Sequence, residues 1–248
     1  MKEQEVFFKN SKGQKLAGLL ANPESDKIII IMSGMRGHKT YYDFINYLTP
    51  ELNKQGFATL RFDFNSHGES EGNSIEFTRA STRKDFEAAL DFVKNKFSKI
   101  GVFTTSMSGA TLLMHGSKNI YCAVIHNPAL LHEQWHFAVK DAKEELDKKG
   151  YYLSYAKRDN REFKFGKPLY DECNNKFMKF SEVNCPTRFL FGEIEHATQD
   201  MRKKMFDMIN TNNKDIKTIK GHRHWRSTPE QDKEIAKYSI DWFKRYLK

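Results

Sequence analysis

Four consecutive isoleucines, Ile28–Ile31, constrain the fold of this chain more than any other feature. A strand with one face in water alternates apolar and polar residues, so an unbroken apolar run indicates a strand that is buried on both faces. Segments with helical periodicity alternate with further strand-like segments along the chain. We therefore expect an α/β fold whose mainly parallel central sheet is covered by helices on both faces.

The expected elements can be placed from periodicity and from turn residues. An edge hairpin is predicted first, and its two strands are joined by a turn at Asn10–Gly13. The expected strands are Val6–Lys9, Lys15–Ala21, Lys27–Met32, Phe57–Phe64, Lys99–Thr105, Tyr121–Ile125, Thr187–Phe191 and Ile216–Ile219, and the main helices are Tyr41–Lys54, Thr78–Phe97, Gln199–Ile209 and Gln231–Leu247.

Residues 130–183 interrupt this alternation. They contain a charged helical stretch, Glu133–Lys148, an aromatic hairpin over Tyr151–Phe165, and a short helix after Pro168. Long excursions between sheet strands commonly carry function as lids or caps. We expect a cap over 130–183 between two parts of one core, 1–129 and 184–248, with an apolar wall for a substrate formed by aromatic side chains: Trp135, Tyr152 and Tyr155.

Bulk properties exclude several classes of protein. The net charge is +9, but lysines and arginines are interleaved with acids and accompany no nucleic-acid-binding signature, so no nucleic-acid partner is expected. The longest apolar run, Ile28–Met32, is too short for a membrane span, which needs about 20 residues. The charged N-terminus lacks the apolar core of a signal peptide. Three cysteines without paired spacing indicate reduced thiols and a cytoplasmic location.

Ser106 stands where a buried strand, Lys99–Thr105, turns into a helix that begins with small residues. A serine hydroxyl is a weak nucleophile unless a sharp turn exposes it beside a base and above backbone N–H donors. The glycine turn at Ser33–Gly37, directly after the isoleucine strand, is a second source of such donors. The backbone amides of Met35 and Met107 are therefore the expected oxyanion hole.

A carboxylate and an imidazole follow Ser106 in the order serine–acid–histidine that is typical of nucleophile-elbow hydrolases. Glu195 lies in the loop after a late strand, and His224 follows the last expected strand. Each lies at the carboxyl end of a strand, where open α/β sheets place their sites. An imidazole with an ordinary pKa of about 6.5 suits proton transfer near neutral pH. Their neighbours Glu193 and His222 stay open as alternatives.

The segment Arg61–Gly72, R-F-D-F-N-S-H-G-E-S-E-G, resembles the stretch R-F-D-F-R-G-H-G-E-S-E-G of α/β-hydrolases. More narrowly, nearly the whole chain resembles small bacterial and archaeal esterases of the cinnamoyl or feruloyl type. The resemblance implies the α/β-hydrolase fold with a cap insertion, and a structural role for His67. It also implies a homodimer, because related small esterases are often dimers. The roles it implies are nucleophile for Ser106, base for His224, acid for Glu195, and oxyanion donors for the amides of Met35 and Met107.

The chain departs from the family's pattern around this site. Thr104 and Ser108 replace the two glycines of the elbow, Glu195 replaces an aspartate, and Ser33 replaces a histidine. The β-branched Thr104 is expected to strain or reshape the turn. A shifted register with Ser108 as the nucleophile is disfavoured, because Ile100–Val102 fixes the strand length. Both the serine and the histidine that catalysis requires are retained.

These observations predict a serine hydrolase that cleaves small-molecule carboxylic esters through a Ser-His-Glu triad and an acyl-enzyme. No metal or organic cofactor is expected, because the histidines show no metal-ligand spacing. One alternative is an acyl-thioester hydrolase or acyltransferase with the same triad, acting on an acyl-carrier protein or acyl-CoA. The basic charge would suit such acidic partners. The other alternative is a catalytically silent binding protein on the same fold.

Overall fold

The computed structural model describes residues 2–130, 134, 141–174, 179–224 and 226–247. Eight strands form one sheet in the order β1-β2-β4-β3-β5-β6-β9-β10. The pairs β1–β2 and β2–β4 are antiparallel and the remaining pairs are parallel, which confirms the expected mainly parallel sheet. The strands are β1 (Gln4–Lys9), β2 (Lys15–Ala21), β3 (Lys27–Met32), β4 (Ala58–Phe62), β5 (Lys99–Thr105), β6 (Cys122–His126), β9 (Thr187–Ile194) and β10 (Lys214–Arg223).

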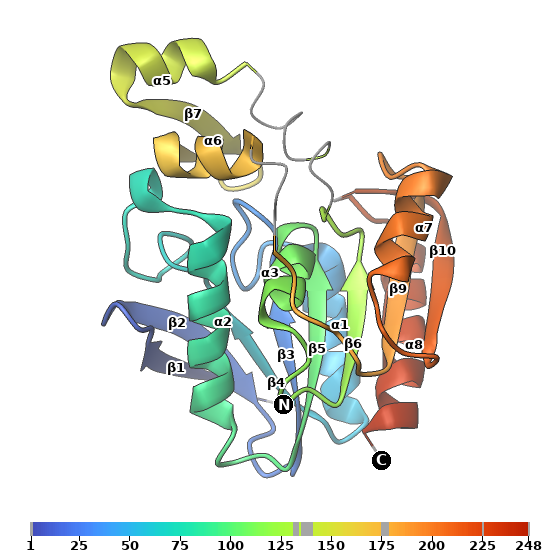
Figure 1. Ribbon diagram of the computed structural model, residues 1–248. Helices are drawn as coiled ribbons and strands as arrows, with labels where there is room; N and C mark the ends of the chain where they lie inside the picture. The colour runs from blue at the N-terminus through green and yellow to red at the C-terminus, as the bar shows by residue number, and fades with distance from the viewer. Residues whose placement is uncertain (1, 131–133, 135–140, 175–178, 225, 248) are drawn as a thin grey trace.

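Helices cover both faces of this sheet (Figure 1). The helices α1 (Asp43–Lys54) and α8 (Pro229–Tyr246) pack on one face. The helices α2 (Arg79–Val93), α3 (Met107–His115) and α7 (Gln199–Asp207) pack on the other. Among the helices of the described residues, none is both long enough and apolar enough to cross a bilayer.

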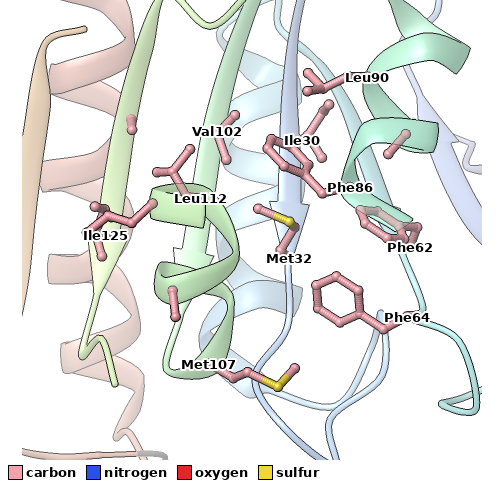
Figure 2. Packing of buried hydrophobic residues seen from close by; sticks show 14 of the residues in the cluster. Ile30, Met32, Phe62, Phe64, Phe86, Leu90, Val102, Met107, Leu112 and Ile125 are labelled. Atoms are coloured by element: carbon pink, nitrogen blue, oxygen red, sulfur yellow. The ribbon is translucent and has the colours of Figure 1, made fainter. Parts of the chain in front are cut away.

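One hydrophobic core lies on each face of the sheet, and the isoleucine run of β3 contributes side chains to both. Ile28 and Ile30 lie in the core beneath α2 and α3, whereas Ile29 and Ile31 lie in the core beneath α1 and α8. All four are at most 2% exposed, so each contributes about 2 kcal/mol of burial free energy. Figure 2 shows Ile30 in the first core, among side chains from β4, α2 and β5. Burial on both faces is the reason this strand carries no alternation.

A separate antiparallel hairpin, β7 (Tyr151–Ala156) and β8 (Arg161–Gly166), lies beyond the carboxyl end of the sheet (Figure 1). The helices α5 (Lys143–Lys149) and α6 (Lys167–Asn174) flank it in the chain. The predicted aromatic hairpin and the helix after Pro168 are therefore present. Of the helix predicted over Glu133–Lys148, the structure describes α5 and the single helical residue 134 before it, and most of the rest lies outside the described residues.

The hairpin is held on the loops that follow β3 and β4. Arg161 donates from Nη1 to the carbonyl of Gly68 at 2.8 Å. Arg36, in the glycine turn after β3, donates from Nη1 to the Ser154 hydroxyl at 3.1 Å. Because these loops emerge at the carboxyl edge of the sheet, the hairpin lies directly beside the expected site.

Candidate active site

Ser106 lies in the turn between β5 and α3 with φ 55° and ψ −117°. A positive φ is strained for a residue with a side chain, and such strain is typical of a turn that exposes a nucleophile. The backbone N–H of Ser106 donates to the carbonyl of His126 at 3.1 Å, and its carbonyl accepts from the N–H of Ala129 at 3.1 Å. The elbow is therefore tied to the end of β6.

The buried side chain of Ser108 stabilises this turn through hydrogen bonds to the backbone. Its hydroxyl accepts from the N–H of Thr105 at 2.9 Å and lies 2.9 Å from the carbonyl of Met32. The residue is fully buried and lies in the first turn of α3. A hydroxyl engaged in this way links β5 to β3, so the polar residue has a structural use at a position where the family's pattern has glycine.

The structure brings Ser106, His224 and Glu195 into one hydrogen-bonded chain. His224 Nε2 lies 2.8 Å from Ser106 Oγ, and His224 Nδ1 lies 2.8 Å from each oxygen of Glu195. The Glu195 side chain is only 1% exposed, whereas 24% of the His224 side chain remains accessible. A buried carboxylate on Nδ1 favours the tautomer that leaves Nε2 free to accept the serine proton.

The two alternatives have other partners. Glu193 accepts a hydrogen bond from the N–H of Gly221 at 2.8 Å. His222 is fully buried, and its Nε2 lies 2.9 Å from Nε2 of His126. Burial lowers the pKa values of both of these histidines, so both are uncharged at neutral pH. The structure thus brings neither Glu193 nor His222 to Ser106.

Arg202 of α7 shapes the loop that carries the carboxylate, and no motif or spacing in the sequence indicated this role. Its Nη2 donates to the carbonyl of Gly192 at 2.7 Å and its Nε donates to the carbonyl of Ala197 at 3.0 Å. These carbonyls flank Glu195 on either side. Burial lowers the pKa of Arg202, and the nearby negative charge of Glu195 opposes that effect.

Two backbone amides remain available near Ser106. Met107 is the first residue of α3, where backbone N–H groups have no partner within the helix. The Met35 N–H lies in the glycine turn, and neither amide donates to another described residue. A Cβ on Gly34 would lie 3.0 Å from Cβ of Ser106 and 2.8 Å from Oη of Tyr42. Glycine therefore allows this turn to lie against the elbow.

His67 holds the next amide of the same turn. It is fully buried, its Nδ1 lies 2.9 Å from the carbonyl of Asn65, and its Nε2 accepts from the N–H of Arg36 at 3.2 Å. Burial lowers the pKa of His67 to about 4, so its Nε2 is an unprotonated acceptor at neutral pH. The structural role implied for His67 thus has a specific form: it fixes Arg36, which has φ 69°, beside the amide of Met35.

The three aromatic residues predicted to line a substrate wall have different positions. Trp135 lies outside the described residues. Tyr152 is buried, 6% exposed, with its ring 5.8 Å from that of Phe165. Tyr155 is 48% exposed and donates to Glu162 at 3.3 Å, so it lies on the outer face of the hairpin. The structure does not bring Tyr155 together with Tyr152 or with the site.

This arrangement is suited to nucleophilic catalysis. A strained serine carries a hydroxyl within hydrogen-bonding distance of an imidazole, and the imidazole contacts a buried carboxylate. The amides of Met35 and Met107 donate to no other residue in the part of the chain that the structure describes. Among the residues that the structure describes, no three His, Cys, Asp or Glu side chains are grouped to hold a metal ion.

Comparisons with known proteins give a family and a fold. The model of the family described as "Serine aminopeptidase, S33" matches residues 23–150, just over half of the 248-residue chain. No curated protein matches the sequence. A putative hydrolase from Agrobacterium vitis S4 is 18% identical with a TM-score of 0.78, and the match covers 97% of this chain and 98% of that one.

Two esterases are also similar in structure. The esterase Pf2001 from Pyrococcus furiosus is 18% identical over 100% of this chain and 92% of that one, with a TM-score of 0.76. Est1E from Butyrivibrio proteoclasticus, solved with ferulic acid bound, is 19% identical over 98% of this chain and 99% of that one, with a TM-score of 0.76. At these identities the likeness establishes the α/β-hydrolase fold.

Proposed function

Because this chain belongs to the serine aminopeptidase S33 family of hydrolases, we propose that it hydrolyses carboxylic esters with Ser106 as the nucleophile, His224 as the base and Glu195 as the acid. The observation that carries the proposal is the continuous chain of 2.8 Å contacts from Ser106 Oγ through the His224 ring to the Glu195 carboxylate. The similarity to two esterases supports the ester as substrate.

The proposed reaction begins when Ser106 attacks the ester carbonyl while its proton passes to His224 Nε2. Negative charge then develops on the carbonyl oxygen, and the N–H groups of Met35 and Met107 donate to it. His224 returns the proton to the leaving alcohol, which leaves an acyl group on Ser106. A water molecule, deprotonated by the same nitrogen, attacks the acyl carbonyl, and His224 returns the proton to Ser106 Oγ as the carboxylic acid leaves. Glu195 stabilises the imidazolium formed in each half of the reaction.

We also propose that residues 130–183 form the substrate cap. Its hairpin is bonded to the Arg36 turn beside the proposed oxyanion donors, which supports this assignment. Tyr152 lies on the inner face of the hairpin, and it is proposed with Trp135 as part of the substrate wall. The exposed position of Tyr155 removes it from this proposal. The three cysteines are free thiols, which supports a cytoplasmic location.

The test is a comparison of substrates on the purified protein. We expect p-nitrophenyl esters and hydroxycinnamate esters to be turned over by the wild type and not by Ser106→Ala. Faster turnover of acyl-CoA would favour the thioester hydrolase alternative, and hydrolysis of aminoacyl anilides alone would favour an aminopeptidase. A wild-type protein that hydrolyses none of these substrates would favour the silent binding protein.

A further inference from the structure

Asn127, the first residue after β6, lies at the junction of the segments that carry the acid and the base. Its side chain is fully buried, and its backbone has φ 39°. Its backbone N–H donates to the carbonyl of Leu190 in β9 at 2.9 Å, which anchors the residue to that strand. A buried amide must satisfy its donors and its acceptor inside the protein, so its partners define its role.

The partners of the Asn127 side chain belong to both segments. Oδ1 accepts from the N–H of Gly192 in β9 at 2.7 Å, and Nδ2 donates to the carbonyls of Arg223 at 3.3 Å and His224 at 3.2 Å. These partners fix the orientation of the side-chain amide. A flipped amide would place its NH₂ group against the N–H of Gly192 and its oxygen against the carbonyls of Arg223 and His224. One side chain therefore bonds the acid-bearing strand to the backbone of the histidine itself.

The pairing of β10 with β9 is irregular near Arg223, where Asn127 donates its hydrogen bonds. Ile219 pairs with Gly192 and Arg223 pairs with Ile194, so four residue steps on β10 oppose two on β9. This register shift places two extra residues on β10, and we refer to the segment as the bulge of β10. Extra residues of this kind redirect the side chain that follows them and leave backbone groups without ladder partners. The carbonyls of Arg223 and His224 lie just after the bulge, and Asn127 supplies their donor.

We propose that Asn127 is a positioning residue for catalysis, which sets the direction of His224 toward Ser106 by fixing the bulged end of β10 to β9. This inference rests on the proposed function. Asn127 does not contact the Ser106 hydroxyl in the described structure; it acts through the backbone of the histidine. A displacement of about 1 Å in a catalytic group costs up to about 100-fold in rate, so a small change at this anchor suffices.

The test uses Asn127→Asp, which keeps the shape and the acceptor for Gly192 but replaces the donor by an oxygen that repels the two carbonyls. The matched control is Asn53→Asp in α1. Asn53 is 5% exposed and its Nδ2 donates to Phe57 O and Thr59 Oγ1, both at 3.0 Å. It lies near the amino end of β4, at the opposite edge of the sheet from Ser106.

We expect Asn127→Asp to lower kcat about 10- to 100-fold and to leave KM unchanged within about twofold. We expect Asn53→Asp to lose as much thermal stability as Asn127→Asp but to retain the kcat of the wild type. A kcat for Asn127→Asp within about twofold of the wild type, or an equal loss in both variants, would overturn the inference.

A second measurement separates this inference from the proposed function. A proton on His224 Nδ1, hydrogen-bonded to Glu195, is a target for NMR that does not depend on ester hydrolysis. We expect Asn127→Asp to shift or broaden that resonance and Asn53→Asp to leave it in place. If the wild type hydrolyses no ester, the proposed function fails while this measurement still decides the positioning role, and an unchanged resonance in Asn127→Asp overturns it.

Discussion

His67 makes the fold sensitive to acid in a way that can be measured. The ring is enclosed by Phe77 and Phe163, with centroids at 4.7 and 4.8 Å, and its Nε2 must stay unprotonated to accept from the N–H of Arg36. Burial lowers the pKa of His67 to about 4, below its ordinary value of 6.5. Protonation therefore places a desolvated charge in the core and removes the acceptor that holds the glycine turn.

The magnitude follows from these two pKa values. Between pH 6.5 and pH 4 the unfolded chain binds a proton at His67 that the folded chain does not, so the free energy of unfolding falls as the pH falls. The contribution of His67 is fully present above pH 6.5 and is lost by about pH 4. The difference of about 2.5 between the pKa values corresponds to about 3 kcal/mol, of which about 2 kcal/mol is lost between pH 7 and pH 5.

Urea denaturation of the wild type and of His67→Gln at pH 7, 6 and 5 measures this contribution. Glutamine keeps an acceptor for the N–H of Arg36 but does not titrate. The variant should be less stable at pH 7, and its loss of stability down to pH 5 should be smaller than that of the wild type by about 2 kcal/mol. The buried His126 and His222 titrate in both proteins and cancel in the comparison. Parallel curves, or an NMR titration that places the His67 pKa near 6.5, would refute the reasoning.

Two further substitutions test the geometry of the site. Glu195→Gln should lower kcat by about 10²- to 10⁴-fold, because an amide neither stabilises the imidazolium nor enforces the tautomer, while Glu193→Gln should stay within about twofold of the wild type in the same p-nitrophenyl ester assay. Equal losses in these two variants would contradict the assignment of the acid. Gly34→Ala should lower both kcat and the free energy of unfolding, the latter by about 1–3 kcal/mol, since the new methyl group would lie 2.8 Å from Tyr42 Oη and 3.0 Å from Ser106 Cβ. A fully active and fully stable Gly34→Ala protein would mean that the turn does not need to lie against the elbow.

Periodicity and chain order predicted the parts of this molecule that depend on local sequence. The isoleucine run became β3 with the predicted bounds, because its burial on both faces leaves an unmistakable pattern. The order of Ser106, Glu195 and His224 selected three residues that the structure then brings within hydrogen-bonding distance. Parallel strands place their carboxyl ends at one edge, so such order carries spatial information.

Contacts that depend on tertiary packing could not be predicted from the sequence. Asn127 and Arg202 act on backbone carbonyls of distant segments, and no spacing or motif indicates which carbonyl a side chain reaches. The position of Tyr155 was predictable in part. It lies three residues after Tyr152 on one strand, and an odd separation places two side chains on opposite faces. Strand alternation therefore argued against both tyrosines lining one wall.

Covalent labelling tests the central claim most directly. The wild type should form a one-to-one adduct with a fluorophosphonate probe, and mass spectrometry of its peptides should place the adduct on Ser106. Ser106→Ala should form no adduct, and His224→Ala should react far more slowly, because the hydroxyl has then lost its base. An adduct on any other residue, or equal labelling of wild type and Ser106→Ala, would contradict the account.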